Sequence, residues 1–384
     1  MFVRHLRSCV PHFYMPRFES SPSYEHGLPE SLGVLLVNLG TPDEPTTPAV
    51  RRYLRQFLSD PRVVEVPRPI WWLILNGFIL TTRPSRSAAA YRKIWTDQGS
   101  PLLLHTMDIA RGLQEKLSAR LSGAVHVEVG MSYGNPSIDA ALEKLYQQCV
   151  RRIVLLPLYP QYSGTTTGTV FDAVTRALSR RRWVPELRFI NHYHDANGYI
   201  AALAASVRDH WDMHGRGERL LMSFHGVPKR TLLSGDPYHC QCQKTARLLA
   251  ESLELEADEW QVSFQSRVGR EEWLRPYTDE TLEAWGRDRV GLMDVVCPGF
   301  SADCLETLEE IAMENATAFR EAGGGDLRYI PALNAREDHV SFLSRTIEKS
   351  VGGWPEADPD WNMSEASRQL EKSLERARQM GATC

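Results

Sequence analysis

Eight short apolar runs, most of them followed by Gly, Pro, Asn or Ser, constrain this 384-residue chain more than any other feature. They are rich in Val, Ile, Leu and Phe, as are parallel strands that are buried on both faces. The runs span residues 34–38, 125–131, 153–158, 187–191, 220–224, 260–265, 292–297 and 327–330. Helical patterns lie between them at 47–58, 107–121, 137–148, 197–213, 240–255, 303–320 and 337–350. The alternation predicts an α/β fold built from right-handed βαβ units.

Eight strands divide naturally into two four-stranded parallel sheets flanked by helices. We place the break near residue 180, where Arg180-Arg-Arg182 marks a polar crossing. The first sheet domain is then expected over 31–180 and the second over 181–332. The remaining segments are expected to be an N-terminal extension over 1–30, a helix over 333–352 that returns to the first domain, and a C-terminal tail over 353–384 with a charged helix at about 364–379.

Composition and missing motifs exclude several classes of function. The 44 Lys and Arg against 48 Asp and Glu give a net charge of −4, which argues against a dedicated nucleic-acid binder. No Walker A or G-x-G-x-x-G loop follows a strand, so no nucleotide cofactor is expected. The seven cysteines are odd in number and widely spaced, which is typical of reduced thiols in the cytoplasm. We see neither a secretory signal nor an apolar run near the ~20 residues that span a bilayer.

In such folds ligands bind beyond the carboxyl ends of the strands. His225 directly follows the apolar run at 220–224 and precedes Gly226. A histidine at this place points toward the ligand crevice and accepts protons near neutral pH. The alternative is a structural histidine that is hydrogen-bonded within a turn, and position alone leaves both interpretations open.

Four carboxylates follow the seventh run. Asp303, Glu306 and Glu310 fall on one face of the predicted helix at 303–320, and Glu309 accompanies them. Acidic residues in a first helical turn commonly complement the helix dipole or form a capping box. Four carboxylates are more than a helix cap requires. A carboxylate here that faced His225 would handle protons or hold a divalent metal loosely.

Two further features keep alternatives open. Cys240 and Cys242, together with Cys297 and Cys304, make an iron–sulfur cluster conceivable. Metal-binding pairs usually have two or more intervening residues, so isolated thiols are the favoured interpretation.

The run at 70–80, with Trp71 and Trp72, is either core or an apolar lip beside a cleft, which would meet a membrane surface or an apolar substrate.

Six segments, in order, resemble the ferrochelatase family of bacterial type, over about residues 32–350. They are GVLLVNLGTP at 33–42, YRKIWTDQGSP at 91–101, LYPQYS at 158–163, SFHGVP at 223–228, FQSRVG at 264–269 with WLRPYTDE at 273–280, and CPGFSADCLETLEE at 297–310. The resemblance implies two Rossmann-like domains, as in class II chelatases, with a cleft between them. It also implies insertion of Fe²⁺ into protoporphyrin IX to form protohaem, the terminal step of haem biosynthesis, with no required cofactor.

The resemblance also implies roles for particular residues. His225 and Glu306 match the family's metal-delivery and proton-removing pair, and Glu310 and Asp303 extend the acidic face. Positions that match the porphyrin-binding wall and lip are Leu39, Arg83, Tyr91, Ser100, Tyr159, Ser163 and Trp273. An animal-type [2Fe–2S] cluster is not expected, because Gly164 replaces one cluster cysteine and the tail offers only Cys384.

The resemblance leaves open a related chelatase for cobalt or coproporphyrin, or a non-catalytic porphyrin-binding protein. A cytoplasmic protein without a nucleic-acid partner is expected, and the 70–80 lip leaves open a peripheral, transient contact with the inner membrane.

Overall fold

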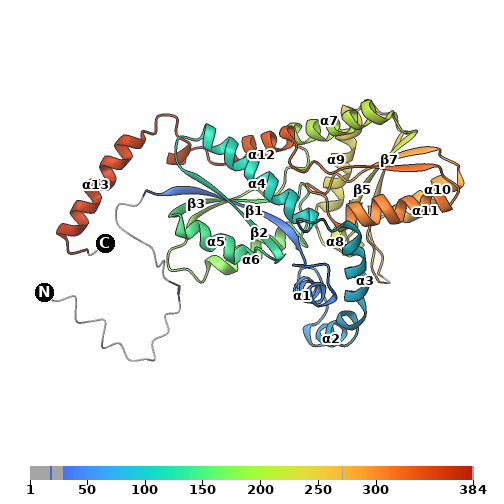
Figure 1. Ribbon diagram of the computed structural model, residues 1–384, viewed down its shortest axis with the longest axis horizontal. Coiled ribbons are helices and arrows are strands. Elements are labelled where there is room, and N and C mark those ends of the chain that lie inside the picture. Colours follow the sequence, from blue (N-terminus) through green and yellow to red (C-terminus); the bar gives the residue numbers. More distant parts are fainter. Residues whose placement is uncertain (1–17, 20–28, 270, 383–384) are drawn as a thin grey trace.

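The computed structural model describes residues 18–19, 29–269 and 271–382, and it contains two four-stranded parallel sheets (Figure 1). The first sheet has the order β2-β1-β3-β4 and the second has the order β6-β5-β7-β8, so the two halves repeat one topology. The strands are β1 Ser31–Thr41, β2 Val125–Gly134, β3 Val150–Pro157, β4 Glu186–Phe189, β5 Arg219–His225, β6 Trp260–Gln265, β7 Leu292–Val296 and β8 Asp326–Ile330. The predicted fold class is therefore confirmed.

The helices of the first half precede those of the second along the chain. In the first half they are α1 Thr47–Leu58, α2 Arg68–Ile74, the π-helix η1 Leu75–Ile79, α3 Leu80–Ile94, α4 Pro101–Arg120, α5 Ile138–Gln147 and α6 Thr167–Leu178. The later helices are α7 Asn197–His214, α8 Lys229–Leu233, α9 Tyr238–Ser252, α10 Thr278–Arg287, the π-helix η2 Glu306–Asn315, α11 Ala316–Glu321, α12 Glu337–Ser350, the 3-10 turn η3 Pro355–Ala357 and α13 Met363–Gln379.

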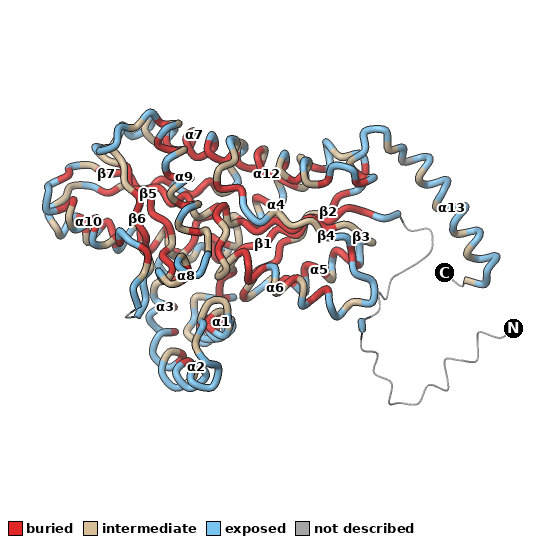
Figure 2. The backbone as a smooth tube through the Cα atoms, turned by 180° about the vertical axis from the view of Figure 1, so that it is seen from behind, coloured by how far each residue is buried: buried red, intermediate tan, exposed pale blue. Residues whose placement is uncertain are grey.

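Strand β1 shows why the apolar runs form buried strands. Its side chains alternate between two cores, as the period of a strand requires. Val34 belongs to the same buried cluster as Leu113 of α4, whereas Leu35 belongs to the cluster that contains Leu142 of α5 and Val170 of α6. Both faces are thus covered by helices, and the red interior strands in Figure 2 follow this pattern. A continuous apolar sequence is the consequence.

The predicted domain break at residue 180 is misplaced. Strand β4 pairs with β3, with Ile153 opposite Leu187, so the first sheet continues beyond residue 180. The arginine triplet has a different role. The backbone of Glu19 exchanges hydrogen bonds with Arg180 and Arg182, and its carboxylate lies within 3.6 Å of the guanidinium of Arg180. The triplet thereby binds the N-terminal segment at one of the few places where the structure describes it.

Helix α6 was not predicted, because its Thr- and Gly-rich start extends the loop pattern that follows β3. The helix predicted at 303–320 instead begins at Glu306 and continues for ten residues as a π-helix.

The C-terminal elements extend along and beyond the first half. Helix α12 packs against α4, with Val340 3.0 Å from where a Cβ on Gly112 would lie. The predicted terminal helix is present as α13, and none of its described side chains is buried. Most of the proposed extension over 1–30, and Cys384, lie outside the described residues. Within the described part of the chain, no helix is both long and apolar enough to cross a bilayer.

Candidate functional site

His225 is the last residue of β5, a central strand of the second sheet. Its ring is half-buried, and Nδ1 lies 2.6 Å from the carbonyl oxygen of Gly226. Because a carbonyl oxygen only accepts, Nδ1 must carry the proton. This fixes the tautomer and leaves the lone pair of Nε2 available for a metal ion or a proton.

Gly226 allows an aromatic ring to approach His225. A Cβ at this position would lie 2.7 Å from the carbonyl oxygen of Gln265 and 3.1 Å from the ring of Trp273. The indole Nε1 of Trp273 donates to the carbonyl of Val268 at 3.0 Å, which holds the ring in place. The structure therefore brings Trp273, one of the predicted wall residues, next to the strand end that carries His225.

Gln265 connects the strand of His225 with the helix of Glu306. It is the parallel strand partner of His225, and its side chain is buried. Its Oε1 accepts from Ser223 Oγ at 2.7 Å, while its Nε2 donates to the backbone carbonyl of Glu306 at 2.9 Å. One amide thus fixes the start of η2 against β5. The segment FQSRVG at 264–269 contains Gln265, but the sequence analysis did not assign this residue to the site.

Glu306 is the first residue of η2. A π-helix of this length is unusual, and π-helical segments occur frequently at functional sites. Glu310 follows on the same helix, and its Oε1 accepts from the backbone nitrogen of Ser266 at 2.8 Å while its Oε2 accepts from Ser266 Oγ. Burial raises the pKa of the Glu310 carboxyl; the Glu306 charge also raises it, whereas Ser266 and His225 lower it. His225 and both carboxylates are therefore electrostatic neighbours.

Three tyrosines of the first half lie close enough to Glu306 for its charge to act on them; Tyr53 and Tyr91 are buried and Tyr159 is half-buried. They are Tyr53 of α1, Tyr91 of α3 and Tyr159 after β3. Burial raises the pKa of each phenol, and the charge of Glu306 raises it further. The two halves consequently meet around Glu306. Tyr91 and Tyr159 are predicted wall or lip residues, whereas Tyr53 carried no motif signal. We call His225, Glu306, Glu310 and these three tyrosines the interlobe site.

The other predicted porphyrin contacts differ in how far they are buried and in which residues they contact. Leu39 is half-buried and packs on the apolar cluster that also contains Tyr91 and receives Leu305. Arg83 is exposed on α3. Ser100 and Ser163 are only 3% and 1% exposed: Ser100 accepts from Thr41 Oγ1 at 2.8 Å, and Ser163 donates to Asp236 at 3.0 Å. Both hydroxyls hold loops together rather than pointing to solvent.

The prediction that Asp303 shares one helical face with Glu306 and Glu310 is wrong. Asp303 precedes η2 and is buried. Its Oδ1 accepts from Tyr329 at 2.6 Å and from Thr307 at 3.0 Å, and its Oδ2 accepts from Asn334 at 2.7 Å. These bonds occupy the carboxylate, which therefore anchors the loop after β7. The carboxylate of Glu309 is likewise occupied, because it forms an ion pair with Lys93 of α3 at 2.5 Å.

The four cysteines considered for a cluster do not form a ligand set. Cys240 is exposed, while Cys242, Cys297 and Cys304 are buried, and burial raises the pKa of each of these three thiols. Across the described ranges, the side chains whose ligand atoms converge are His192, His194 and Asp195, and no cysteine is among them.

The segment at 70–80 combines both of its predicted roles. Trp71 turns inward, and its Nε1 donates to the carbonyl of Leu58 at 2.6 Å. The outer face is apolar and exposed, with Trp72 at 63% and Phe78 at 67%. We call the exposed large apolar residues of α2 and η1 the apolar lip; they are Ile70, Trp72, Leu73, Ile74 and Phe78.

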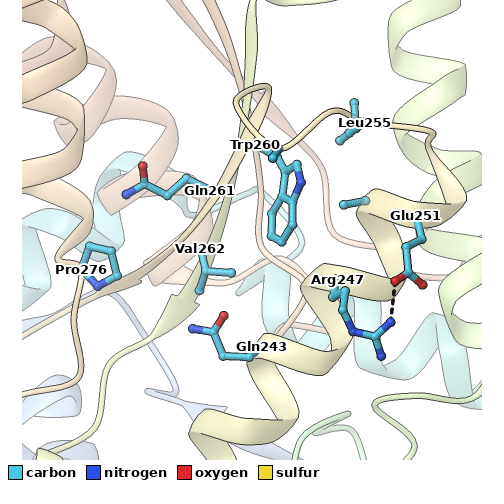
Figure 3. A pocket seen from close by; sticks show the side chains of 10 residues that line it. Gln243, Arg247, Glu251, Leu255, Trp260, Gln261, Val262 and Pro276 are labelled. Atoms are coloured by element: carbon cyan, nitrogen blue, oxygen red, sulfur yellow. Dashed lines mark hydrogen bonds and ion pairs between the residues drawn. The ribbon is translucent and has the colours of Figure 1, made fainter.

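A groove of about 480 Å³ lies elsewhere, between α9 and the edge strand β6 (Figure 3). Trp260 and Val262 form its apolar wall, and the ion pair of Arg247 with Glu251 borders it. It shares no residue with the interlobe site.

Known proteins share the sequence and the fold of this chain. The family model for ferrochelatase matches residues 31–351. The ferrochelatase of Thioalkalivibrio sulfidiphilus is 58% identical over 95% of this chain and 99% of its own length, and that of Nitrosococcus oceani is 54% identical over the same shares. The solved structure of SirB from Bacillus subtilis with Fe³⁺ shares the fold at a TM-score of 0.51, with 14% identity, over 86% of this chain and all of that one. The chain belongs to the ferrochelatase family.

Proposed function

We propose that this protein inserts Fe²⁺ into protoporphyrin IX at the interlobe site, with His225 and Glu306 as the groups that act on metal and protons. The observation that carries this proposal is the fixed tautomer of His225, whose free Nε2 shares an electrostatic neighbourhood with Glu306 and Glu310. The reaction converts one porphyrin and one Fe²⁺ into haem and two protons. It needs a base, a weak metal ligand and a surface that binds a flat macrocycle.

The two pyrrole protons leave as the metal enters. In the proposed reaction the lone pair of His225 Nε2 takes up one proton and the carboxylate of Glu306 takes the other. Before that, a neutral imidazole and a carboxylate form a ligand pair of the kind that holds Fe²⁺ without strong retention. Glu310 keeps a second carboxyl beside the pair, and burial raises the pKa of this carboxyl.

Aromatic and aliphatic side chains support the macrocycle in this proposal. Trp273 and Tyr159 approach from opposite halves of the molecule, and Leu39 and Tyr91 lie on the same apolar cluster. Flat rings of this kind bind a porphyrin face by stacking. The exposed guanidinium of Arg83 is suited to a propionate. Ser100 and Ser163 act in this scheme by holding the loops that carry the wall.

The apolar lip points to how the substrate arrives. Exposed apolar patches commonly mark contacts with membranes or other apolar partners. We infer that the protein works in the cytoplasm and touches the inner membrane transiently through the lip. A lip of this length and polarity favours protoporphyrin over the more polar coproporphyrin.

The proposed activity is tested by mixing the purified protein with Fe²⁺ and protoporphyrin IX without oxygen. Appearance of the haem spectrum, with Fe²⁺ used faster than Co²⁺ and protoporphyrin faster than coproporphyrin, supports it. Faster use of Co²⁺ would favour a cobalt chelatase, and porphyrin binding without insertion of any metal would favour a binding protein.

A further inference from the structure

The loop between β4 and α7 carries a second group of metal-ligating side chains. His192, His194 and Asp195 each offer one ligand atom, and these atoms all lie within 4.8 Å of one another. None of the three belongs to the interlobe site, and none was singled out by the sequence patterns.

The central ligand of this group is buried without a partner. His194 is 6% exposed, and its Nδ1 makes no hydrogen bond within the described part of the chain. The nearest charged group is Asp195, whose Oδ1 lies 3.8 Å from that nitrogen. The ring of His192 stands 5.0 Å away from the ring of His194, between centroids. A buried polar atom that lacks a partner is costly, and this one lies 3.8 Å from a carboxylate oxygen of the same group.

The surrounding structure holds the loop in place. The backbone carbonyl of His194 accepts from Thr245 of α9 at 2.9 Å, and the backbone nitrogen of Tyr193 donates to the carbonyl of Pro160 at 2.9 Å. Lys244 of α9 binds Asp195 Oδ2 at 2.6 Å, which leaves Oδ1 on the side of His194. A cation at the cluster would therefore bind to prepositioned groups, with one ammonium nearby that opposes it.

We propose that His192, His194 and Asp195 form a second divalent-metal site, separate from the interlobe site, for an ion of the Zn²⁺ type. Two imidazoles and one carboxylate, with an open position for water, suit Zn²⁺ and Co²⁺. Metal–ligand bonds of roughly 2.0–2.2 Å require these donors to draw closer together than they stand. His192 is the exposed member of the group, so it supplies most of this movement.

Co²⁺ alone is the probe, because its visible absorption reports the ligands and bound ions can be counted by equilibrium dialysis. The background is the full chain with His225→Ala and Glu306→Gln, which removes the ligands of the interlobe site. We expect one Co²⁺ per chain in this background. His192→Ala or His194→Asn should weaken that binding at least about tenfold. His239→Asn, on α9 outside the cluster, is the matched control and should leave it unchanged.

The Lys244→Gln variant should change Co²⁺ affinity in the opposite direction. Removing the ammonium frees Asp195, so Co²⁺ should bind severalfold more tightly. Zn²⁺ should also raise the Tm of the background protein and not that of its His192→Ala variant, because a ligand that binds the folded state stabilises it. Since His192 is exposed, this variant keeps its fold. Equal Co²⁺ affinity and stoichiometry with and without His192 would overturn the proposal, as would absence of binding in the background protein.

Discussion

His225 donates its Nδ1–H to the carbonyl oxygen of Gly226 across 2.6 Å. This one bond decides which ring nitrogen is free, and it aims the other nitrogen away from the backbone. The residue that accepts the bond is also the one whose missing side chain lets Trp273 approach. The tautomer of His225, its free ring nitrogen and the approach of the Trp273 ring therefore depend on two consecutive residues, His225 and Gly226.

Gly226→Ala should disturb both features. The new methyl group would lie 2.7 Å from the carbonyl of Gln265 and 3.1 Å from the Trp273 ring, so strand and indole must shift. Overpacking of this kind costs about 1–3 kcal/mol. We expect a lower unfolding free energy in urea and weaker porphyrin binding by fluorescence. Gly77→Ala is the control, because no atom lies within 4 Å of its Cβ position; equal losses in both variants would contradict this explanation.

The Gln265→Met variant should distinguish a loss of Glu306 positioning from a loss of porphyrin binding. The variant keeps the side-chain volume but removes the hydrogen bond to the Glu306 carbonyl and leaves the Ser223 hydroxyl with Thr278 as its remaining partner. The loss of these two buried hydrogen bonds should lower the unfolding free energy by about 1–3 kcal/mol. Misplacement of Glu306 should lower kcat about 10–100-fold with little change in KM for porphyrin.

Gln261→Met on the same strand is the control for this variant, since the amide of Gln261 makes a long contact of 3.5 Å with Thr281. A Gln265→Met enzyme with unchanged kcat would show that the amide does not position the catalytic carboxylate.

Acid should destabilise the fold through His339. Complete burial lowers the pKa of this ring to about 4, while the carbonyl of Asn334 and the charge of Asp338 oppose the shift. As the pH falls below about 6.5, the unfolded chain takes up a proton that the folded ring refuses, so stability declines until the pH approaches 4. The loss reaches up to about 3 kcal/mol for this one group.

His339→Asn removes that titration and keeps a donor for the carbonyl of Asn334. Its unfolding free energy should therefore fall less between pH 7 and pH 4.5 than that of the wild type. His214→Asn, at an exposed position, should retain the wild-type slope. Identical slopes for His339→Asn and the wild type would rule out this origin of the acid sensitivity.

The strands were predictable because burial on both faces of a parallel sheet demands a continuous apolar run, as in β1 and β5. Their grouping was harder to predict. β4 is short and only partly buried, and the arginines before it indicated a boundary although they bind Glu19. Helix α6 was missed because residues 163–168 look like a loop, and hydrogen bonds from Ser163 and Gly164 to Asp236 organise its start.

In the site, His225 could be recognised from its place after a strand, and Glu306 from its motif. Sequence periodicity could not reveal that η2 is a π-helix, so it placed Asp303 on the same face as Glu306. It also could not show that the carboxylate of Asp303 is occupied by hydrogen bonds from Tyr329, Thr307 and Asn334. Tyr53 and Gln265 become part of the site only through tertiary packing.

Substitutions in the apolar lip should weaken membrane contact without harming the fold. Trp72 and Phe78 are exposed, so Trp72→Ser with Phe78→Ser removes apolar surface that the core does not use. Burial of two such side chains in a bilayer interface is worth about 3 kcal/mol or more. Partitioning onto phosphatidylethanolamine–phosphatidylglycerol vesicles should therefore drop at least about tenfold. Leu233→Ser, on α8, is the control; equal partitioning of lip variant and wild type would exclude the lip as the contact.

The assignment of His225 and Glu306 is tested most directly by comparing porphyrin binding with Fe²⁺ insertion in the same samples. His225→Ala and Glu306→Gln should each lower the anaerobic rate of haem formation at least about 100-fold, while quenching of protein fluorescence shows protoporphyrin bound as in the wild type. His214→Asn and Glu283→Gln, both at exposed positions, should retain full rates. Haem formation at the wild-type rate in either site variant would contradict the account.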